Sequence, residues 1–163
     1  MLTDKRIALF PGTFDPFTIG HESIVKRALN LFDEIVIAIG INESKRTYFT
    51  LEERKEMIEH LYADHPKVSV AVYQELTIDF AAKLQAHYIL RGIRSVTDFE
   101  YEKSIADVNR ELSGIETVVI FTEPVYTHIS SSIVRELIKY KKDVSGFVPS
   151  ALQLNEMLLK RDQ

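Results

Sequence analysis

The 163-residue chain contains no cysteine and no tryptophan. The absence of cysteine excludes disulfides, thiolate chemistry and cysteine-ligated metals. No apolar run is long enough to span a membrane. The run near the start ends at Pro11-Gly12, which is too early for a signal peptide. We therefore expect a cytoplasmic protein.

The chain also lacks a basic excess, since 20 lysines and arginines face 24 acidic residues and the net charge is -4. A general nucleic-acid-binding protein carries a basic excess or a basic stripe, and this chain shows neither. An anionic ligand must therefore bind where cations are concentrated locally, at Lys45-Arg46 or at Arg91 with Arg94. An apolar content of 45% and this length predict one folded domain over residues 1–163.

Hydrophobic patterning predicts strands that alternate with helices. Strands are expected over 7–10, 34–41, 68–73, 88–90 and 117–121, and helices after the first loop and over about 50–60, 77–86, 98–111 and 130–141. Thr50 to Glu53 forms a capping box, Thr77 is predicted to cap the next helix, and Pro149 fits the first turn of a final helix. The alternation favours an α/β fold: a Rossmann-like, doubly wound, five-stranded parallel sheet with helices on both faces.

Four unusual polar segments each follow a predicted strand. They span residues 11–21, 42–46, 91–102 and 122–132. In an open parallel sheet, ligands bind at the carboxyl ends of the strands, where the strand order reverses. The spacing of the segments therefore predicts one ligand site at this edge.

The first segment contains neither GxxxxGK[ST] nor GxGxxG. It does place Gly20-His21 at the opening of a helix, where free N–H groups and the helix dipole bind anions. Gly20 lets a ligand approach the backbone, and His21 supplies a donor. The alternative is a tight turn at Gly20 with His21 on the surface.

The other segments have alternatives of the same kind. Ser44-Lys45-Arg46 is either an anion-binding loop or a solvated loop. Arg91 and Arg94 either hold phosphate oxygens bidentately or form structural ion pairs with Asp98, Glu100 and Glu102. The serines at 130–132 are either ordinary helix caps or a second anion site.

Together these residues resemble the phosphopantetheine adenylyltransferase family, within the nucleotidyltransferases that carry a (H/T)xGH motif. The resemblance is carried by PGTFDP at 11–16, TIGH at 18–21, Lys45, TLEER at 50–54, RGIR at 91–94, DFEYE at 98–102 and ISSS at 129–132. TxGH is shared across a broad superfamily. The stretch RGIRSVTDFEYE is typical of the pantetheine branch, and not of the cytidylyltransferases or the nicotinate-mononucleotide enzymes.

The resemblance implies that ATP and 4'-phosphopantetheine react reversibly to give dephospho-coenzyme A and pyrophosphate, in coenzyme A biosynthesis. It also implies magnesium, a homohexamer and coenzyme A as a feedback inhibitor. By similarity, His21, Lys45 and Arg94 are catalytic. The acceptor site is assigned to Thr13, Lys45, Thr77 and Arg91, and the ATP site to Thr13, Phe14, His21, Gly92, Ile93, Arg94, Glu102, Tyr126, Thr127, His128, Ile129, Ser130, Ser131 and Ser132. Some relatives carry Trp in place of Tyr126, which leaves the role of that side chain open.

The expected mechanism follows from charge. The acceptor phosphate is mostly ionised at neutral pH, because its second pKa lies near ~6. It needs no general base and no covalent enzyme intermediate, only positioning and charge stabilisation. We predict no protein-held metal, since the histidines form no HExxH pattern, and we expect magnesium to remain on the ATP phosphates. A sister nucleotidyltransferase and a non-catalytic nucleotide-binding module are the alternatives.

Overall fold

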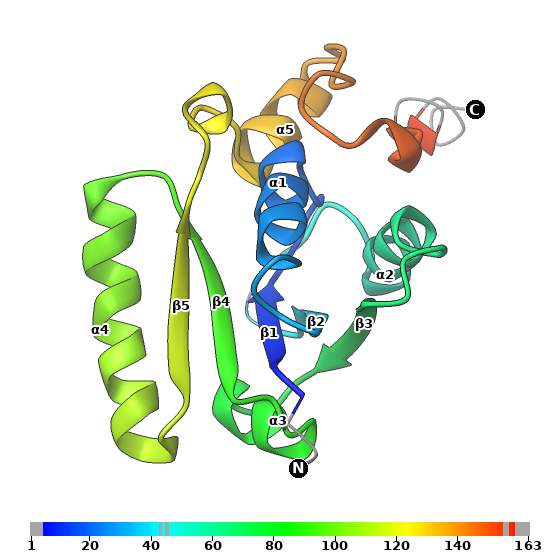
Figure 1. The fold of residues 1–163 in the computed structure, drawn as a ribbon. Helices are drawn as coiled ribbons and strands as arrows, with labels where there is room; N and C mark the ends of the chain where they lie inside the picture. Colours follow the sequence, from blue (N-terminus) through cyan, green and yellow to red (C-terminus); the bar gives the residue numbers. More distant parts are fainter. Residues whose placement is uncertain (1–4, 43, 45, 155–156, 159–163) are drawn as a thin grey trace.

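A computed structural model describes residues 5–42, 44, 46–154 and 157–158. Five parallel strands form one sheet in the order β3-β2-β1-β4-β5 (Figure 1). The strands are β1 (Ile7–Gly12), β2 (Glu34–Gly40), β3 (Val68–Tyr73), β4 (Tyr88–Ile93) and β5 (Glu116–Phe121). The helices are α1 (Ile19–Ala28), α2 (Leu51–Leu61), α3 (Thr77–Lys83), α4 (Val96–Ser113) and α5 (Ser131–Lys139), with 3₁₀ turns at Pro124–Tyr126 and Ser150–Leu152. The predicted Rossmann-like α/β fold is confirmed.

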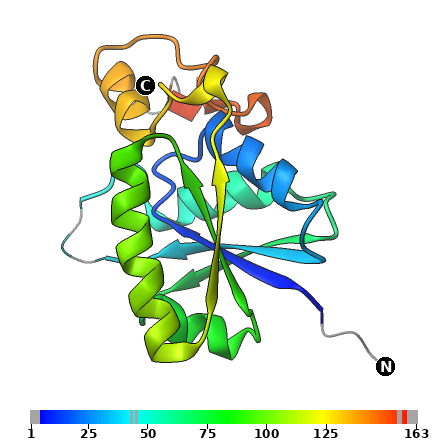
Figure 2. The same ribbon diagram turned by 60° about the vertical axis from the view of Figure 1, so that its left-hand side comes forward.

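Helices cover both faces of the sheet (Figures 1 and 2). The larger apolar core lies on the α1 and α2 face and includes Ile24, Val25 and Ile58. A smaller core lies on the opposite face, where Ala81 of α3 packs near Leu9. Because both faces are covered, the central strands read as unbroken apolar runs in the sequence.

The strand order reverses between β1 and β4, and these two strands separate toward their carboxyl ends. They pair only at Ala8 with Tyr88 and at Leu9 with Ile89. Beyond that point the Arg91 side chain spans the gap, since its Nη1 donates to the Pro11 carbonyl oxygen at 2.6 Å. The opening at this switch point is where an open α/β sheet binds its ligand.

Several predicted boundaries were wrong. β4 continues to Ile93 and α4 begins at Val96, because the Ser95 hydroxyl accepts the Asp98 N–H and caps the helix two residues earlier than expected. Thr77 is the first helical residue and not the cap, because its hydroxyl bonds the Tyr73 hydroxyl at 3.0 Å. Pro149 precedes a 3₁₀ turn and does not lie in the first turn of an α-helix.

Among the described residues, no helix is both long and apolar enough to cross a membrane. The single domain over 1–163 stays a prediction.

Candidate active site

Two adjoining cavities open at the carboxyl ends of β1 and β4. The first, here called the His21 cavity, has a volume of about 380 Å³ and is lined by residues of β1, α1, β4, α4 and α5. The second, here called the Tyr73 cavity, has a volume of about 360 Å³ and extends toward β3 and α3. They share the lining residues Pro11, Gly12, Thr13, Arg91 and Glu102. The site therefore has room for two ligands, or for two parts of one ligand, that meet beside Thr13 and Arg91.

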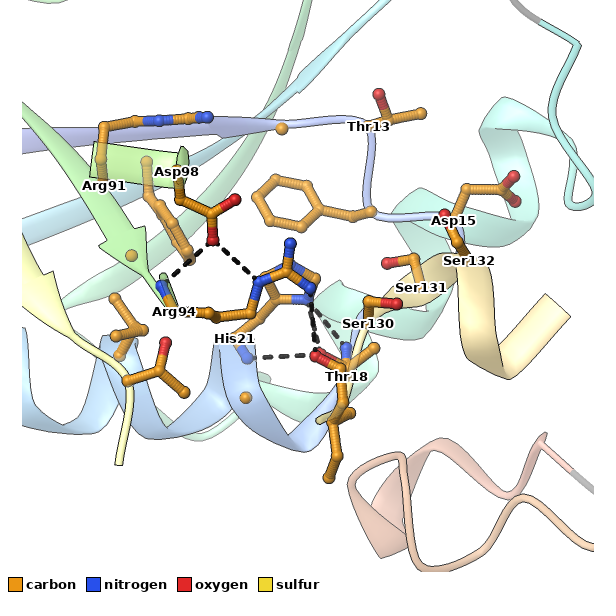
Figure 3. Close-up of a pocket in the computed structure, with 18 of the residues that line it drawn as sticks. Thr13, Asp15, Thr18, His21, Arg91, Arg94, Asp98, Ser130, Ser131 and Ser132 are labelled. Carbon is orange, nitrogen blue, oxygen red and sulfur yellow. Dashed lines mark hydrogen bonds and ion pairs between the residues drawn. The ribbon is translucent and has the colours of Figure 1, made fainter. Parts of the chain in front are cut away.

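His21 is held in one orientation by the cap of α1. Thr18 is the N-cap residue; its hydroxyl accepts the His21 N–H, and its own N–H donates to His21 Nδ1 at 3.0 Å. Since Nδ1 accepts a hydrogen bond, the neutral ring carries its proton on Nε2. His21 lines the cavity close to Arg94 (Figure 3). The cap thus leaves the Nε2–H of the ring as the donor for a ligand.

The surroundings of His21 favour the neutral ring. The rings of Phe14 and Phe17 lie at 5.2 Å from it, centroid to centroid. Burial, and then the charges of Arg94 and Arg91, lower the pKa of His21 to about 4. At pH 7 the side chain is therefore a neutral hydrogen-bond donor and not a cation.

This lowered pKa predicts a pH-dependent stability. In the unfolded chain His21 takes up a proton below pH ~6.5, and in the folded chain only near pH 4. The unfolded state binds more protons between these values, so the free energy of unfolding decreases as the pH falls through this window. Between pH 7 and pH 5 the wild type should lose about 2 kcal/mol more than His21→Gln, which keeps a capping acceptor. Urea unfolding at both pH values measures this, and equal losses would contradict it.

Arg91 and Arg94 both form ion pairs. This was one of the two alternatives predicted for these residues. Arg91 forms a fork with Glu102, with contacts of 2.7 and 2.5 Å. Arg94 Nε lies 3.2 Å from Asp98 Oδ2, and the same oxygen accepts the Arg94 N–H. Both arginines nevertheless line the His21 cavity. A guanidinium has five N–H donors, so a carboxylate fixes each side chain and leaves donors for an anion.

The start of α5 faces the start of α1 across the His21 cavity. Ser130 caps α5 by accepting the Ile133 N–H, and the Ser131 hydroxyl donates to the Pro16 carbonyl. These bonds fix the helix end against the loop that follows β1. The first N–H groups of a helix have no partner inside it, so two helix starts point partial positive charge at one space (Figure 3).

Most of the predicted site residues lie together. The His21 cavity is lined by Thr13, Phe14, His21, Arg91, Gly92, Arg94, Glu102, Ile129, Ser130, Ser131 and Ser132, and the Tyr73 cavity by Thr13, Thr77, Arg91 and Glu102. Ile93, Tyr126, Thr127 and His128 line neither of these two cavities. Lys45 lies outside the described residues.

The His21 cavity is also lined by Asp15, Thr18 and Arg135, which the sequence patterns had not assigned to the site. Each had a signal. Asp15 and Thr18 stand inside the quoted motifs, and Arg135 follows Ser131 by four residues, which places it on the same face of α5. Two residues of the second cavity carried no comparable signal, because neither lies in one of the four polar segments: Tyr73 ends β3 and Asn109 lies within α4.

The fold and the two cavities define a nucleotide-binding α/β protein, and a family model described as cytidylyltransferase-like matches residues 9–137. A phosphopantetheine adenylyltransferase of Bacteroides thetaiotaomicron is 60% identical over 150 residues, covering 92% of this chain and 99% of the relative. Those of Phocaeicola vulgatus and Flavobacterium johnsoniae are 61% and 54% identical, covering 92% and 93% of this chain and 99% of each relative. The chain belongs to the phosphopantetheine adenylyltransferase family.

Proposed function

We propose that the chain transfers the adenylyl group of ATP to 4'-phosphopantetheine and releases pyrophosphate, a step of coenzyme A biosynthesis. The observation that carries the proposal is the pair of adjoining cavities that meet at Thr13 and Arg91. ATP occupies the His21 cavity, which holds both helix starts. The pantetheine arm occupies the Tyr73 cavity, with Thr77 at its wall. Family membership supports the same reaction.

The reaction follows from this placement. A phosphate oxygen of the acceptor attacks the α-phosphorus of ATP, a new P–O bond forms, and the bond to the β-phosphate oxygen breaks as pyrophosphate leaves. The nucleophile is already ionised, so no side chain needs to remove a proton. The protein supplies alignment and stabilises negative charge. His21 Nε2–H, Arg94 and Lys45 are the groups we assign to the α-phosphate and its transition state.

The remaining polar groups of the site bind ATP before the reaction. The N–H groups at the start of α5, with Ser130 to Ser132, bind the β- and γ-phosphates. Gly92 and Ile129, which line the same cavity, enclose the nucleoside. The assignment of Tyr126, Thr127 and His128 to ATP rests on the family resemblance alone, since these residues line neither cavity. A Cβ placed on Gly20 would meet only the Thr18 hydroxyl, at 3.6 Å. The glycine therefore keeps the start of α1 open to a phosphate.

Magnesium fits this site as an ion bound to the ATP phosphates. Each of the three carboxylates of the His21 cavity already has a protein partner: Asp15 accepts two backbone N–H groups, Asp98 bonds Arg94, and Glu102 bonds Arg91. Phosphate oxygens are therefore the ligands left for a hard cation. When bound, magnesium neutralises phosphate charge.

The proposal is tested by pyrophosphate release from magnesium-ATP with and without 4'-phosphopantetheine. We expect release only when the acceptor is present, and loss of release when magnesium is chelated. ATP binding without acceptor-dependent release would leave a nucleotide-binding module and overturn the proposal. Release with nicotinate mononucleotide instead would assign the chain to a sister activity.

We also propose that the chain assembles as a homohexamer. Helix α4 exposes an apolar stripe at helical spacing, formed by Tyr101, Ile105, Val108 and Leu112, which are 38–67% exposed. Phe121 on β5 and Val125 are exposed as well. An apolar surface of this kind marks a protein–protein contact, and further copies of the chain are the partner we assign to it.

Leu112→Glu should disrupt this assembly, because it places a charge inside a buried apolar contact. We expect the mass from light scattering to fall from that of six chains toward that of smaller species. Lys103→Glu changes the charge of the same helix outside the stripe and should keep the wild-type mass. An unchanged mass for Leu112→Glu, or a monomeric wild type, would contradict the proposal.

Coenzyme A differs from the product dephospho-coenzyme A by one phosphate, and we infer that it competes for both cavities. The cytoplasmic location stays a prediction.

A further inference from the structure

Asp15 lies at the centre of a buried network beside the His21 cavity. Its side chain is 4% exposed. Oδ1 accepts the Phe49 N–H and Oδ2 accepts the Tyr48 N–H, both at 2.8 Å. Asp15 follows β1, whereas Tyr48 and Phe49 immediately precede α2. One carboxylate therefore joins two segments that lie more than thirty residues apart.

The same short loop is also held from two helices. Arg54 of α2 donates to the Thr13 carbonyl at 2.6 Å. Arg135 of α5 donates to the Asp15 carbonyl at 2.7 Å and to the Ser132 hydroxyl at 3.1 Å. Consequently the segment before α2, the loop after β1 and the start of α5 form one hydrogen-bonded unit.

These contacts indicate that the Asp15 carboxylate holds backbone and not substrate. Each oxygen already accepts a backbone N–H, and the Arg135 guanidinium lies 3.8 Å from Oδ2. A general base or a metal ligand needs a lone pair turned toward the reacting groups. The function of this carboxylate is to fix the backbone around it.

We propose that Asp15 is a positioning residue for adenylyl transfer. It fixes the loop that carries Thr13, at the junction of the two cavities, against the segment before α2 and the α5 start that we assign to the triphosphate. The inference rests on the proposed function, because it makes one carboxylate set the alignment of the acceptor phosphate with the α-phosphate. Errors of about 1 Å in such alignment cost on the order of 10²-fold in rate.

Asp15→Asn is the first test, because the amide has nearly the same shape but only one acceptor oxygen. Its NH₂ group would face a backbone N–H, so one bond is lost and two donors oppose each other. We expect kcat to fall about 10- to 100-fold, while the Kd for magnesium-ATP from calorimetry changes less than about threefold. Asp15→Glu keeps the charge and moves the oxygens by one methylene, so it should show the same pattern and serves if the asparagine variant does not fold.

A double-mutant cycle distinguishes a specific positioning effect of Asp15 from a general destabilisation of the fold. If Asp15 acts by holding this loop together with Arg135, Asp15→Asn should lower kcat less than about twofold further in an Arg135→Ala background. Asp33→Asn is the matched control, since the Asp33 carboxylate also accepts a backbone N–H, from Arg6 at 2.9 Å, but at the opposite edge of the sheet. Its kcat should equal that of the wild type.

Three results would overturn the proposal: an unchanged kcat in both Asp15 variants, a full multiplicative loss in the Arg135→Ala background, or a loss of kcat matched by an equal loss of ATP affinity. Failure of the proposed function is a different result, because the wild type itself would then show no acceptor-dependent release.

Discussion

Replacing His21 by alanine is expected to lower kcat about 10²- to 10³-fold, the usual cost of removing one donor that stabilises transition-state charge. The ring is neutral because its pKa is lowered to about 4, and Thr18 occupies Nδ1. Nε2–H is therefore ready to donate to the oxygens of the α-phosphate, where charge redistributes during transfer. Steady-state kinetics with both substrates varied measure the effect, and the loss should appear in kcat more than in KM.

His21→Gln controls for the cap of α1. A glutamine at the third helical position can accept the Thr18 N–H, as in an ordinary capping box. We expect its stability at pH 7 to stay near that of the wild type, while its kcat stays well below wild type because the amide lacks the reach of Nε2. If His21→Ala keeps its kcat within about threefold of the wild type, His21 is only a capping residue.

Replacing Glu102 by alanine is expected to lower the free energy of unfolding by about 2–3 kcal/mol, because it leaves the partly buried Arg91 guanidinium without its carboxylate. The Glu102 side chain is 10% exposed and that of Arg91 is 29% exposed. We also expect a lower kcat/KM, since Arg91 loses the fork that orients it at the junction of the two cavities.

Urea unfolding at pH 7 and at one fixed protein concentration measures this loss, because assembly makes stability depend on concentration. The matched control is Asp107→Ala. It removes an exposed ion pair with Lys103 on the same helix, worth less than about 1 kcal/mol. Equal losses for the two variants would show that the Arg91–Glu102 pair does not stabilise the fold.

The sequence predicted the sheet and the position of the site because both depend on local signals. Buried strands such as 34–40 are continuous apolar runs, and polar segments at their ends had to meet at one edge. The boundaries that failed were decided by single side-chain bonds. Ser95 caps α4 earlier than the periodicity indicated, and the Thr77 hydroxyl bonds Tyr73 instead of capping α3.

The pairing of charges inside the site could not be predicted from spacing alone. Spacing left three candidate acids for Arg91 and Arg94. The structure pairs Arg91 with Glu102, because α4 brings that residue over the end of β4. The bond between Asp15 and the backbone before α2 joins distant segments. No local pattern indicates such a contact, although the motif containing Asp15 was conspicuous.

The central claim is the identity of the acceptor, and mass spectrometry of the reaction products tests it most directly. The wild type, given magnesium-ATP and an equimolar mixture of 4'-phosphopantetheine and nicotinate mononucleotide, should form dephospho-coenzyme A and pyrophosphate in a 1:1 ratio, and essentially none of the nicotinate product. Formation of the nicotinate dinucleotide instead, or of no adenylylated product, would contradict the account.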